Sequence, residues 1–331
     1  MEAIEIKENR LLFDYLAFSS TIDSTQSIMD LLGLSDEVRQ SMQCIKGHYG
    51  YRDRFYFDGI SIHFNGAANM GVCLEMSGKG CRNFEQFGNG DYEALFNYIC
   101  DNPEVNITRL DVAYDDFQCL LDIDTIFNDI VAGNYVSRFK SFPIEFVLSK
   151  STSRMSKTVY FGSRKSDILY RMYDKRAEQR AYHLEHWVRL EMQVRDNNAK
   201  AFIDTYLAVN DLSDVFFSVL NNYIRFVEPS ETDSNISRAP LAPYWAEFLR
   251  CLCKTSLFRP ASDFSESNVE NYVKKQCSSS IISFIALFGF DNFVDFLKGR
   301  AKFSLNPRHE ALLLRHNINI DDVFRQLGES S

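Results

Sequence analysis

The stretch Tyr160-Phe-Gly-Ser-Arg-Lys-Ser-Asp-Ile-Leu-Tyr170-Arg-Met-Tyr173-Asp-Lys-Arg-Ala-Glu178 lies near the middle of a chain of 331 residues and decides how the rest is interpreted. From Arg154 to Arg180 the chain carries eight Lys or Arg against three Asp or Glu. The whole chain, by contrast, has a formal net charge of −9, which excludes a surface that coats a polyanion non-specifically. A nucleic-acid site would therefore be local, although basic, aromatic-rich segments are also common as solvated strand or helix faces.

Two segments with the alternation of a β-strand flank this stretch. Arg109-Leu-Asp-Val-Ala-Tyr-Asp115 precedes it and Trp187-Val-Arg-Leu-Glu-Met-Gln193 follows it. Because successive side chains of a strand point to opposite faces, the charged residues of each segment share one face. They are Arg109, Asp111 and Asp115 in the first segment, and Arg189 and Glu191 in the second.

Acidic side chains on one strand face are costly to bury without a compensating cation. That cation is either a divalent metal or a neighbouring arginine, and the sequence leaves both open. If the two strands are neighbours, Glu191 can meet Asp111, and Glu75 is a third acid in an apolar strand pattern. Hard oxygen ligands suit Mg²⁺ or Mn²⁺ rather than zinc. We predict a site for Mg²⁺ or Mn²⁺ formed by Glu75, Asp111 and Glu191, with Asp115 as a substitute.

The eight cysteines are scattered and form no CxxC pair or zinc spacing, so they indicate reduced thiols in a cytoplasmic protein. The longest apolar run, Ile281 to Phe290, is too short to span a bilayer, and no membrane partner is expected.

Strand and helix patterns alternate along the first two thirds of the chain. Leu11 to Ser20 has strand composition, Tyr49 to Phe57 and Gly59 to Asn65 predict a hairpin that turns at Asp58-Gly59, and Ala68 to Met76 predicts a further strand. Residues 228–243 are polar and contain prolines, and the patterns beyond them are helical. We predict an α+β fold, in which an antiparallel, nuclease-type sheet with flanking helices precedes a small all-helical domain. The predicted domains are a catalytic nicking and DNA-binding domain at 1–227, a linker at 228–243 and a helical C-terminal domain at 244–331.

Four motifs occur in a fixed order and together resemble the replication initiation factor family. They are Ser77-Gly-Lys-Gly-Cys-Arg82, the segment Arg109–Asp115, Tyr160–Ser166 followed by Arg171-Met-Tyr-Asp-Lys175, and Trp187–Glu191. The resemblance covers roughly residues 10 to 230. Members of this family are rolling-circle initiator proteins of plasmids and phages, and relaxases of integrative conjugative elements.

The resemblance implies a chemistry. A tyrosine in the family's Arg-x-Tyr-(Asn/Asp)-Lys motif attacks one DNA strand and becomes linked to its 5′ phosphate, and the matching residue is Tyr173. Tyr170 and Tyr160 are alternatives. A phenol ordinarily has a pKa near 10, so cations must favour its ionised form; we expect Arg171 and Lys175 to lower the pKa of Tyr173. The residues expected to contact DNA are Arg82, Arg109, Ser163, Arg164, Lys165 and Arg189.

The predicted function is that of a rolling-circle replication initiator. It would perform metal-dependent, sequence-specific nicking and religation of single-stranded DNA through a 5′-phosphotyrosine intermediate. The alternatives are a relaxase that starts conjugative transfer of a mobile element, and a catalytically silent DNA-binding regulator. The expected partners are single-stranded or hairpin origin DNA, a helicase of the host or of the element, and a second copy of the chain in a homodimer.

Overall fold

The computed structural model describes residues 8–148, 155–229, 235–252 and 273–301, together with residues 313, 316 and 318. The chain divides into two compact units, Met1–Arg259 and Pro260–Ser331.

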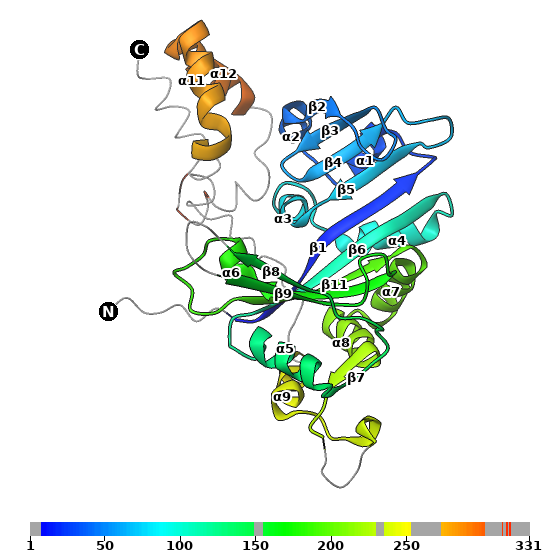
Figure 1. The fold of residues 1–331 in the computed structure, drawn as a ribbon. Helices are drawn as coiled ribbons and strands as arrows, with labels where there is room; N and C mark the ends of the chain where they lie inside the picture. The colour runs from blue at the N-terminus through cyan, green and yellow to red at the C-terminus, as the bar shows by residue number, and fades with distance from the viewer. Residues whose placement is uncertain are drawn as a thin grey trace. The chain divides into compact units, whose positions relative to one another are not determined.

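An antiparallel sheet of ten described strands forms the centre of the first unit (Figure 1). Its two longest strands, β1 and β6, pair with each other in the middle of the sheet. In order across the sheet the strands are β2 (Gln43–Lys46), β3 (Asp53–Phe57), β4 (Ile60–Phe64), β5 (Val72–Met76), β1 (Arg10–Ser20), β6 (Val105–Asp116), β11 (Val188–Arg195), β10 (Ile168–Asp174), β9 (Met155–Phe161) and β8 (Ile144–Leu148).

The two faces of this sheet differ in chemistry. The face that carries Leu110, Val112 and Tyr114 of β6 belongs to a single hydrophobic core, to which the helices contribute side chains such as Phe202 and Phe216. The first unit's helices are α1 (Thr25–Leu31), α2 (Asp36–Ser41), α3 (Gly78–Phe87), α4 (Tyr92–Asp101), α5 (Ile123–Ala132), α6 (Lys175–Glu178), α7 (Asp196–Val209), α8 (Leu212–Tyr223), η1 (Ile236–Arg238) and α9 (Pro243–Leu252). The opposite face carries the charged residues. The predicted α+β class with a large antiparallel sheet and flanking helices is confirmed.

The predicted hairpin turn at Asp58-Gly59 joins β3 to β4, and both residues have a positive φ, at 40° and 99°. Gly59 also lies against the start of α3, where a Cβ on it would come within 2.5 Å of the backbone nitrogen of Gly80. A Cβ on Gly80 would in turn lie 2.1 Å from the Gly59 carbonyl oxygen. Gly80 of the Ser77–Arg82 motif therefore serves the close packing of α3 on this hairpin.

The boundary of the first unit differs from the predicted one. Helix α9, which we assigned to the C-terminal domain, packs inside the first unit, where Trp245 and Phe248 are 1% and 0% exposed. The Phe248 ring lies 5.4 Å from that of Tyr114 on β6, and the Trp245 ring lies 5.0 Å from that of Phe226. The polar segment 228–243 thus does not separate two domains, because the helix that follows it packs in the core of the first unit. Its described part contains η1 and a bridge between Val227 and Leu241.

Beside the main sheet, β7 (Tyr135–Ser137) pairs with β12 (Ile224–Phe226) in a two-stranded sheet. In the second unit the described elements are η2 (Val273–Cys277), α11 (Ser278–Phe288) and α12 (Phe290–Ala301). They are helical, as predicted, and the remainder of the predicted C-terminal domain beyond α9 lies outside the described residues.

No single helix among the described residues is long and apolar enough to cross a membrane. One pair, Ser280–Phe288 and Phe290–Leu297, reaches that length and composition only together, and it is bent by 119° at its break.

The packing of α9 predicts a large effect of Phe248→Ala on the stability of the first unit. Removing a fully buried ring should lower the free energy of unfolding by about 3–5 kcal/mol, measured by denaturant titration. Phe290→Ala on α12 is the matched control, because Phe290 is 63% exposed and should change stability by less than about 0.5 kcal/mol. Equal effects of the two changes would contradict the assignment of α9 to the core.

Candidate active site

A β-bulge in β1 brings an extra acid to the charged face of the sheet. The pairing of β1 with β6 shifts between Phe13 and Tyr15, so Asp14 is the extra residue. Asp14 then lies on the charged face, where its carboxylate accepts a hydrogen bond of 2.7 Å from Nη1 of Arg189. Burial raises the pKa of Asp14 and Glu191 raises it further, while Arg189 opposes both effects.

Arg189 is the buried cation at the centre of this face. It is 4% exposed and stands opposite Asp115 on the neighbouring strand β6. Its Nε and Nη2 donate to the two oxygens of Asp115 at 2.6 and 2.9 Å, a bidentate pair. Arg10 adds a third hydrogen bond to Asp115 at 2.9 Å. Although burial acts to raise the pKa of Asp115, Arg189 and Arg10 hold it below its ordinary value. Asp115 is thus neutralised by arginines, the alternative to metal binding that the sequence had left open.

Tyr173 lies on the same face of the sheet, directly opposite Arg189. Its hydroxyl donates to Oε2 of Glu191 at 3.2 Å and accepts from Nζ of Lys175 at 3.4 Å. The guanidinium of Arg171 lies 5.3 Å from the centre of the Tyr173 ring and donates to Oε1 of Glu191 at 2.6 Å. Tyr173 and Arg171 of the Arg-x-Tyr-x-Lys motif therefore both contact Glu191, which sequence reasoning had placed among the metal ligands. Lys175 instead contacts the Tyr173 hydroxyl and pairs with Glu178.

The expected lowering of the Tyr173 pKa does not occur in this arrangement. Burial raises the pKa of the Tyr173 phenol, and the charge of Glu191 raises it further, while Arg189 and Arg171 oppose them only in part. Tyr173 is 7% exposed, so loss of hydration outweighs the cations. A neutral phenol bound to a carboxylate is the resting arrangement of this site.

Asp111 and Glu191 form the second feature of the site, a pair of adjacent carboxyl groups that are each 1% exposed. Burial raises the pKa of Glu191; Arg171 lowers it, and the neighbouring Asp111 raises it. Asp111 itself accepts hydrogen bonds from Nε of Arg109 at 2.8 Å and from its Nη2. Arg109 also stacks over the ring of Tyr15, 4.0 Å from its centre.

The structure separates Glu75 from this pair. Its two oxygens interact with the hydroxyl of Tyr15 at 2.8 Å and with Nε2 of the fully buried His63 at 3.2 Å. Among the described residues no three His, Cys, Asp or Glu side chains are arranged to hold one metal ion. The predicted four-acid set thus divides into Glu75 with Tyr15 and His63, Asp115 with its arginines, and the adjacent pair Asp111 and Glu191.

The alternative tyrosines occupy different places. Tyr170 is fully buried in the core on the opposite face, where its hydroxyl lies 3.1 Å from the sulfur of Met192. Tyr160 pairs with Arg171 across β9 and β10, and its hydroxyl donates to Glu145 at 2.9 Å. Tyr160 is therefore the alternative that shares a face with Tyr173.

The residues expected to contact DNA fall into three groups. Arg109 and Arg189 belong to the buried network. Arg82 is held inside the fold, where Nη2 donates to the Phe13 carbonyl and to Glu85, each at 2.6 Å. Ser163, Arg164 and Lys165 are exposed in the turn between β9 and β10, and Arg164 pairs there with Glu145.

Sequence reasoning missed Asp14, Tyr15 and Arg10. All three lie on β1, which was read as an unbroken strand, and a bulge changes which side chains share a face. The signal was a single acid, Asp14, within the apolar run Leu11 to Phe18.

The chain was compared with known proteins and families. Residues 105–300 match the family described as replication initiation factor, and residues 10–99 match the N-terminal domain of rolling-circle replication initiation proteins. The chain is 30% identical over 327 residues to a Bacillus subtilis (strain 168) protein named "Putative DNA relaxase NicK", covering 94% of this chain and 91% of that protein. A solved structure of a rolling-circle replication initiator protein from Geobacillus stearothermophilus is also similar. It has a TM-score of 0.70 and 30% identity, over 76% of this chain and 99% of the other.

The Asp115 to Arg189 pair predicts a pH-dependent contribution to stability. Because the folded pKa of Asp115 lies below its ordinary value of 3.8, the unfolded chain binds the proton first. The stabilisation is therefore complete above about pH 4 and is lost as the pH falls further. Asp115→Asn should lower the free energy of unfolding at neutral pH by about 3 kcal/mol, because it leaves a buried guanidinium undercompensated. It should also make the loss of stability with falling pH less steep.

Asp204→Asn is the control for this experiment, since Asp204 forms an exposed pair with Lys200 on α7. It should cost less than about 1 kcal/mol, by denaturant titration at several pH values. An Asp115→Asn protein with the stability and acid profile of this control would refute the buried pair as a structural element.

Proposed function

Because the chain belongs to the replication initiation factor family, we propose that it is a rolling-circle replication initiator that nicks and rejoins one strand of its origin DNA through Tyr173. The observation that supports this residue is the contact of Tyr173 and Arg171 with one buried carboxylate, Glu191, and of Lys175 with the Tyr173 hydroxyl. The nearby cations give the site the charge that a phosphate requires.

In the proposed reaction the Tyr173 oxygen attacks the phosphorus of the scissile phosphodiester. Its proton passes to Glu191, which already accepts the phenol's hydrogen bond. The bond from phosphorus to the 3′ oxygen breaks, that oxygen takes up a proton from water, and the 5′ phosphate remains on Tyr173. Religation is the reverse displacement by a 3′ hydroxyl. Arg171 and Lys175 bind the phosphate oxygens and oppose the charge that develops on them.

The metal proposal is narrower than the one drawn from sequence. Magnesium is usually bound through one or two carboxylates together with water and substrate phosphate, and two adjacent buried carboxyl groups meet that requirement. We therefore assign Mg²⁺ or Mn²⁺ to Asp111 and Glu191. Glu75 is left out because it lies apart from this pair, with Tyr15 and His63, and Asp115 because two arginines already neutralise it. Once bound, the ion would neutralise charge on the scissile phosphate and favour the ionised phenol.

A relaxase that starts conjugative transfer would use the same chemistry, and the similarity to the Bacillus subtilis protein supports that alternative. The single-stranded or hairpin form of the DNA, the helicase, the homodimer and the cytoplasmic location remain predictions. Exposed apolar residues on α11 and α12 offer a surface for a second copy or a helicase. They include Ile282, Leu287, Phe288 and Phe290.

The nucleophile can be identified from its DNA adduct. The purified protein is incubated with supercoiled DNA of its own gene region, with Mn²⁺ or EDTA, and the protein-linked oligonucleotide is mapped by mass spectrometry. We expect metal-dependent nicking with the adduct on Tyr173, and loss of both in Tyr173→Phe. Tyr160→Phe, the control on the same sheet face, should keep the adduct. An adduct on Tyr160 would retain the function and overturn the residue, whereas tight binding without any adduct would favour a silent regulator.

Metal binding can be measured without nicking, by titrating Mn²⁺ and recording its electron paramagnetic resonance signal. Asp111→Asn should weaken Mn²⁺ binding by at least about tenfold, because it removes one of two carboxylate ligands. It should leave the hydrogen bond between Tyr173 and Glu191 in place. Glu75→Gln is the control and should bind Mn²⁺ like the parent protein. If Glu75→Gln weakens binding as much as Asp111→Asn, the three-acid site predicted from sequence is the correct one.

A further inference from the structure

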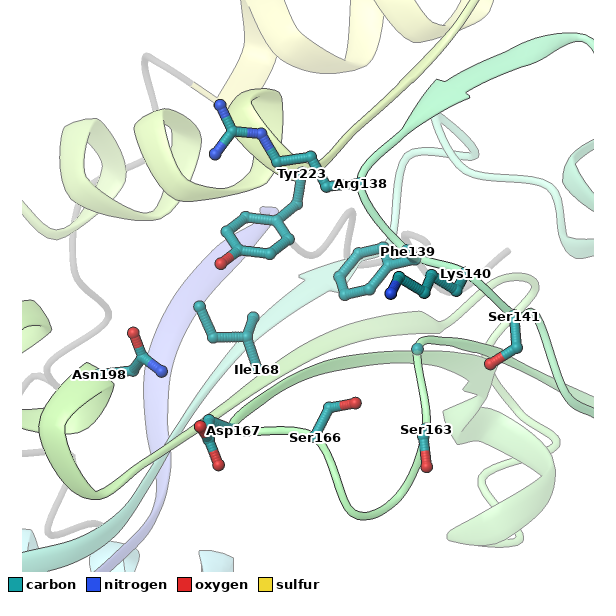
Figure 2. Close-up of a pocket in the computed structure, with 11 residues that line it drawn as sticks. Arg138, Phe139, Lys140, Ser141, Ser163, Ser166, Asp167, Ile168, Asn198 and Tyr223 are labelled. Carbon is teal, nitrogen blue, oxygen red and sulfur yellow. The ribbon is translucent and has the colours of Figure 1, made fainter.

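A cavity of about 400 Å³ lies at the end of β10 that is remote from Tyr173. Figure 2 shows the rings of Phe139 and Tyr223 on one side of it, and Ser163, Ser166, Asp167 and Asn198 on the other. Arg138 and Lys140 supply two positive charges. Within the described part of the chain neither of them forms an ion pair with an acid.

We propose that this cavity binds one unpaired nucleotide of the single-stranded DNA substrate. The volume lies in the range of small-ligand pockets. The two rings are tilted by 37° with their centres 5.2 Å apart, and they offer an aromatic surface to a base. The cations and the serine hydroxyls suit a phosphate, and the Asp167 carboxylate and Asn198 amide suit the polar edge of a base. A purely apolar ligand would leave these groups without partners.

The walls of the cavity are held by backbone contacts, so its shape is formed before a ligand binds. The backbone nitrogen of Arg138 donates to the Tyr223 carbonyl at 2.9 Å, and that of Gly162 donates to the Ser141 carbonyl at 2.9 Å. On the far side, the backbone nitrogen of Arg195 donates to the Asp167 carbonyl at 2.9 Å. Four segments distant in sequence, at residues 138–141, 162–168, 195–198 and 223, are thereby fixed around one space, and little ordering is required on binding.

The turn between β9 and β10 connects the cavity to the candidate active site. Ser163, Ser166 and Asp167 of this turn line the cavity, while Arg164 points to the other face, where it lies 4.9 Å from the centre of the Tyr160 ring. Ile168 and Tyr173 are five residues apart on β10, a rise of about 17 Å. A strand whose phosphate lies at Tyr173 can follow the exposed basic turn around the sheet edge and place a nucleotide several positions away in the cavity.

This inference rests on the proposed DNA function, so its test avoids nicking. Binding is measured in the Tyr173→Phe background by fluorescence anisotropy, with a labelled single-stranded oligonucleotide from the nicked region. The variant is Arg138→Gln with Lys140→Gln. Its control is Lys200→Gln with Arg250→Gln, which removes two surface charges from α7 and α9. Thermal unfolding of both variants should match the parent, because all four side chains are on the surface.

We expect the cavity variant to bind at least about tenfold more weakly than the parent, and the control to differ by less than about twofold. The slope of log affinity against log salt should fall by about 1.4, the value for two lost phosphate contacts on a single strand. Equal affinity of cavity variant and control would overturn the proposal, whatever the nicking assay shows. Conversely, if Tyr173 proved not to be the nucleophile, the binding measurement would still stand.

An abasic scan identifies the bound nucleotide and separates it from general charge attraction. Each position of the oligonucleotide is made abasic in turn, and binding is measured with the parent and with Phe139→Leu. Removing the base at one position should weaken binding to the parent. The same change should not weaken binding to Phe139→Leu any further, because that variant has already lost the contact with the base. Equal losses at every position would refute a single-nucleotide pocket. A second outcome would also refute the proposal. If free deoxynucleoside monophosphate competes for the cavity while the variants bind the oligonucleotide as the parent does, the cavity takes a free nucleotide.

Discussion

The ion pair between Arg189 and Asp115 is the interaction on which the site depends. A guanidinium that is 4% exposed is stable in the fold only if its charge and its donors are matched, and Asp115, Asp14 and their strands supply the match. The pair joins β11 to β6 at this register, and the bulge of β1 brings Asp14 to the same guanidinium. Since Tyr173 stands opposite Arg189 and Glu191 lies two residues further along β11, the same register sets the position of the phenol against its carboxylate.

Burial also keeps the Tyr173 phenol protonated in the absence of substrate. Loss of hydration raises the pKa of Tyr173 and of Glu191, and the cations nearby compensate only in part. The phenol keeps its proton, and its hydrogen bond to Glu191 holds it in place. A bound cation would lower both pKa values. Tyr173 would therefore lose its proton more easily once the site holds that cation. The pKa of a tyrosine exposed to water would lack this dependence on burial and on a bound cation.

Periodicity was sufficient to predict much of this arrangement. Alternation in Arg109–Asp115 and Trp187–Gln193 identified the charged faces, and the condition for Glu191 to meet Asp111, that β6 and β11 are neighbours, is met by their pairing. Alternation could not show the bulge at Asp14, because Leu11 to Phe18 is largely apolar on both faces and has no two-residue period whose phase could shift. It also could not show that Glu75 is occupied by Tyr15 and His63, since those contacts join strands far apart in sequence. A helix at the position of α9 was predicted, but the polar segment before it led us to assign that helix to a separate domain.

Strand β10 links the two parts of the molecule that are proposed to contact DNA. Its last residues include Arg171 and Tyr173 on the charged face, and its first residue, Ile168, lines the cavity. Because a strand in the interior of a sheet is held by hydrogen bonds on both sides, the separation between these two points is rigid. A single DNA strand that occupies both points is therefore positioned by the backbone of one strand rather than by flexible loops. Such fixed spacing would let a site without base-specific contacts at Tyr173 still choose which phosphate it attacks.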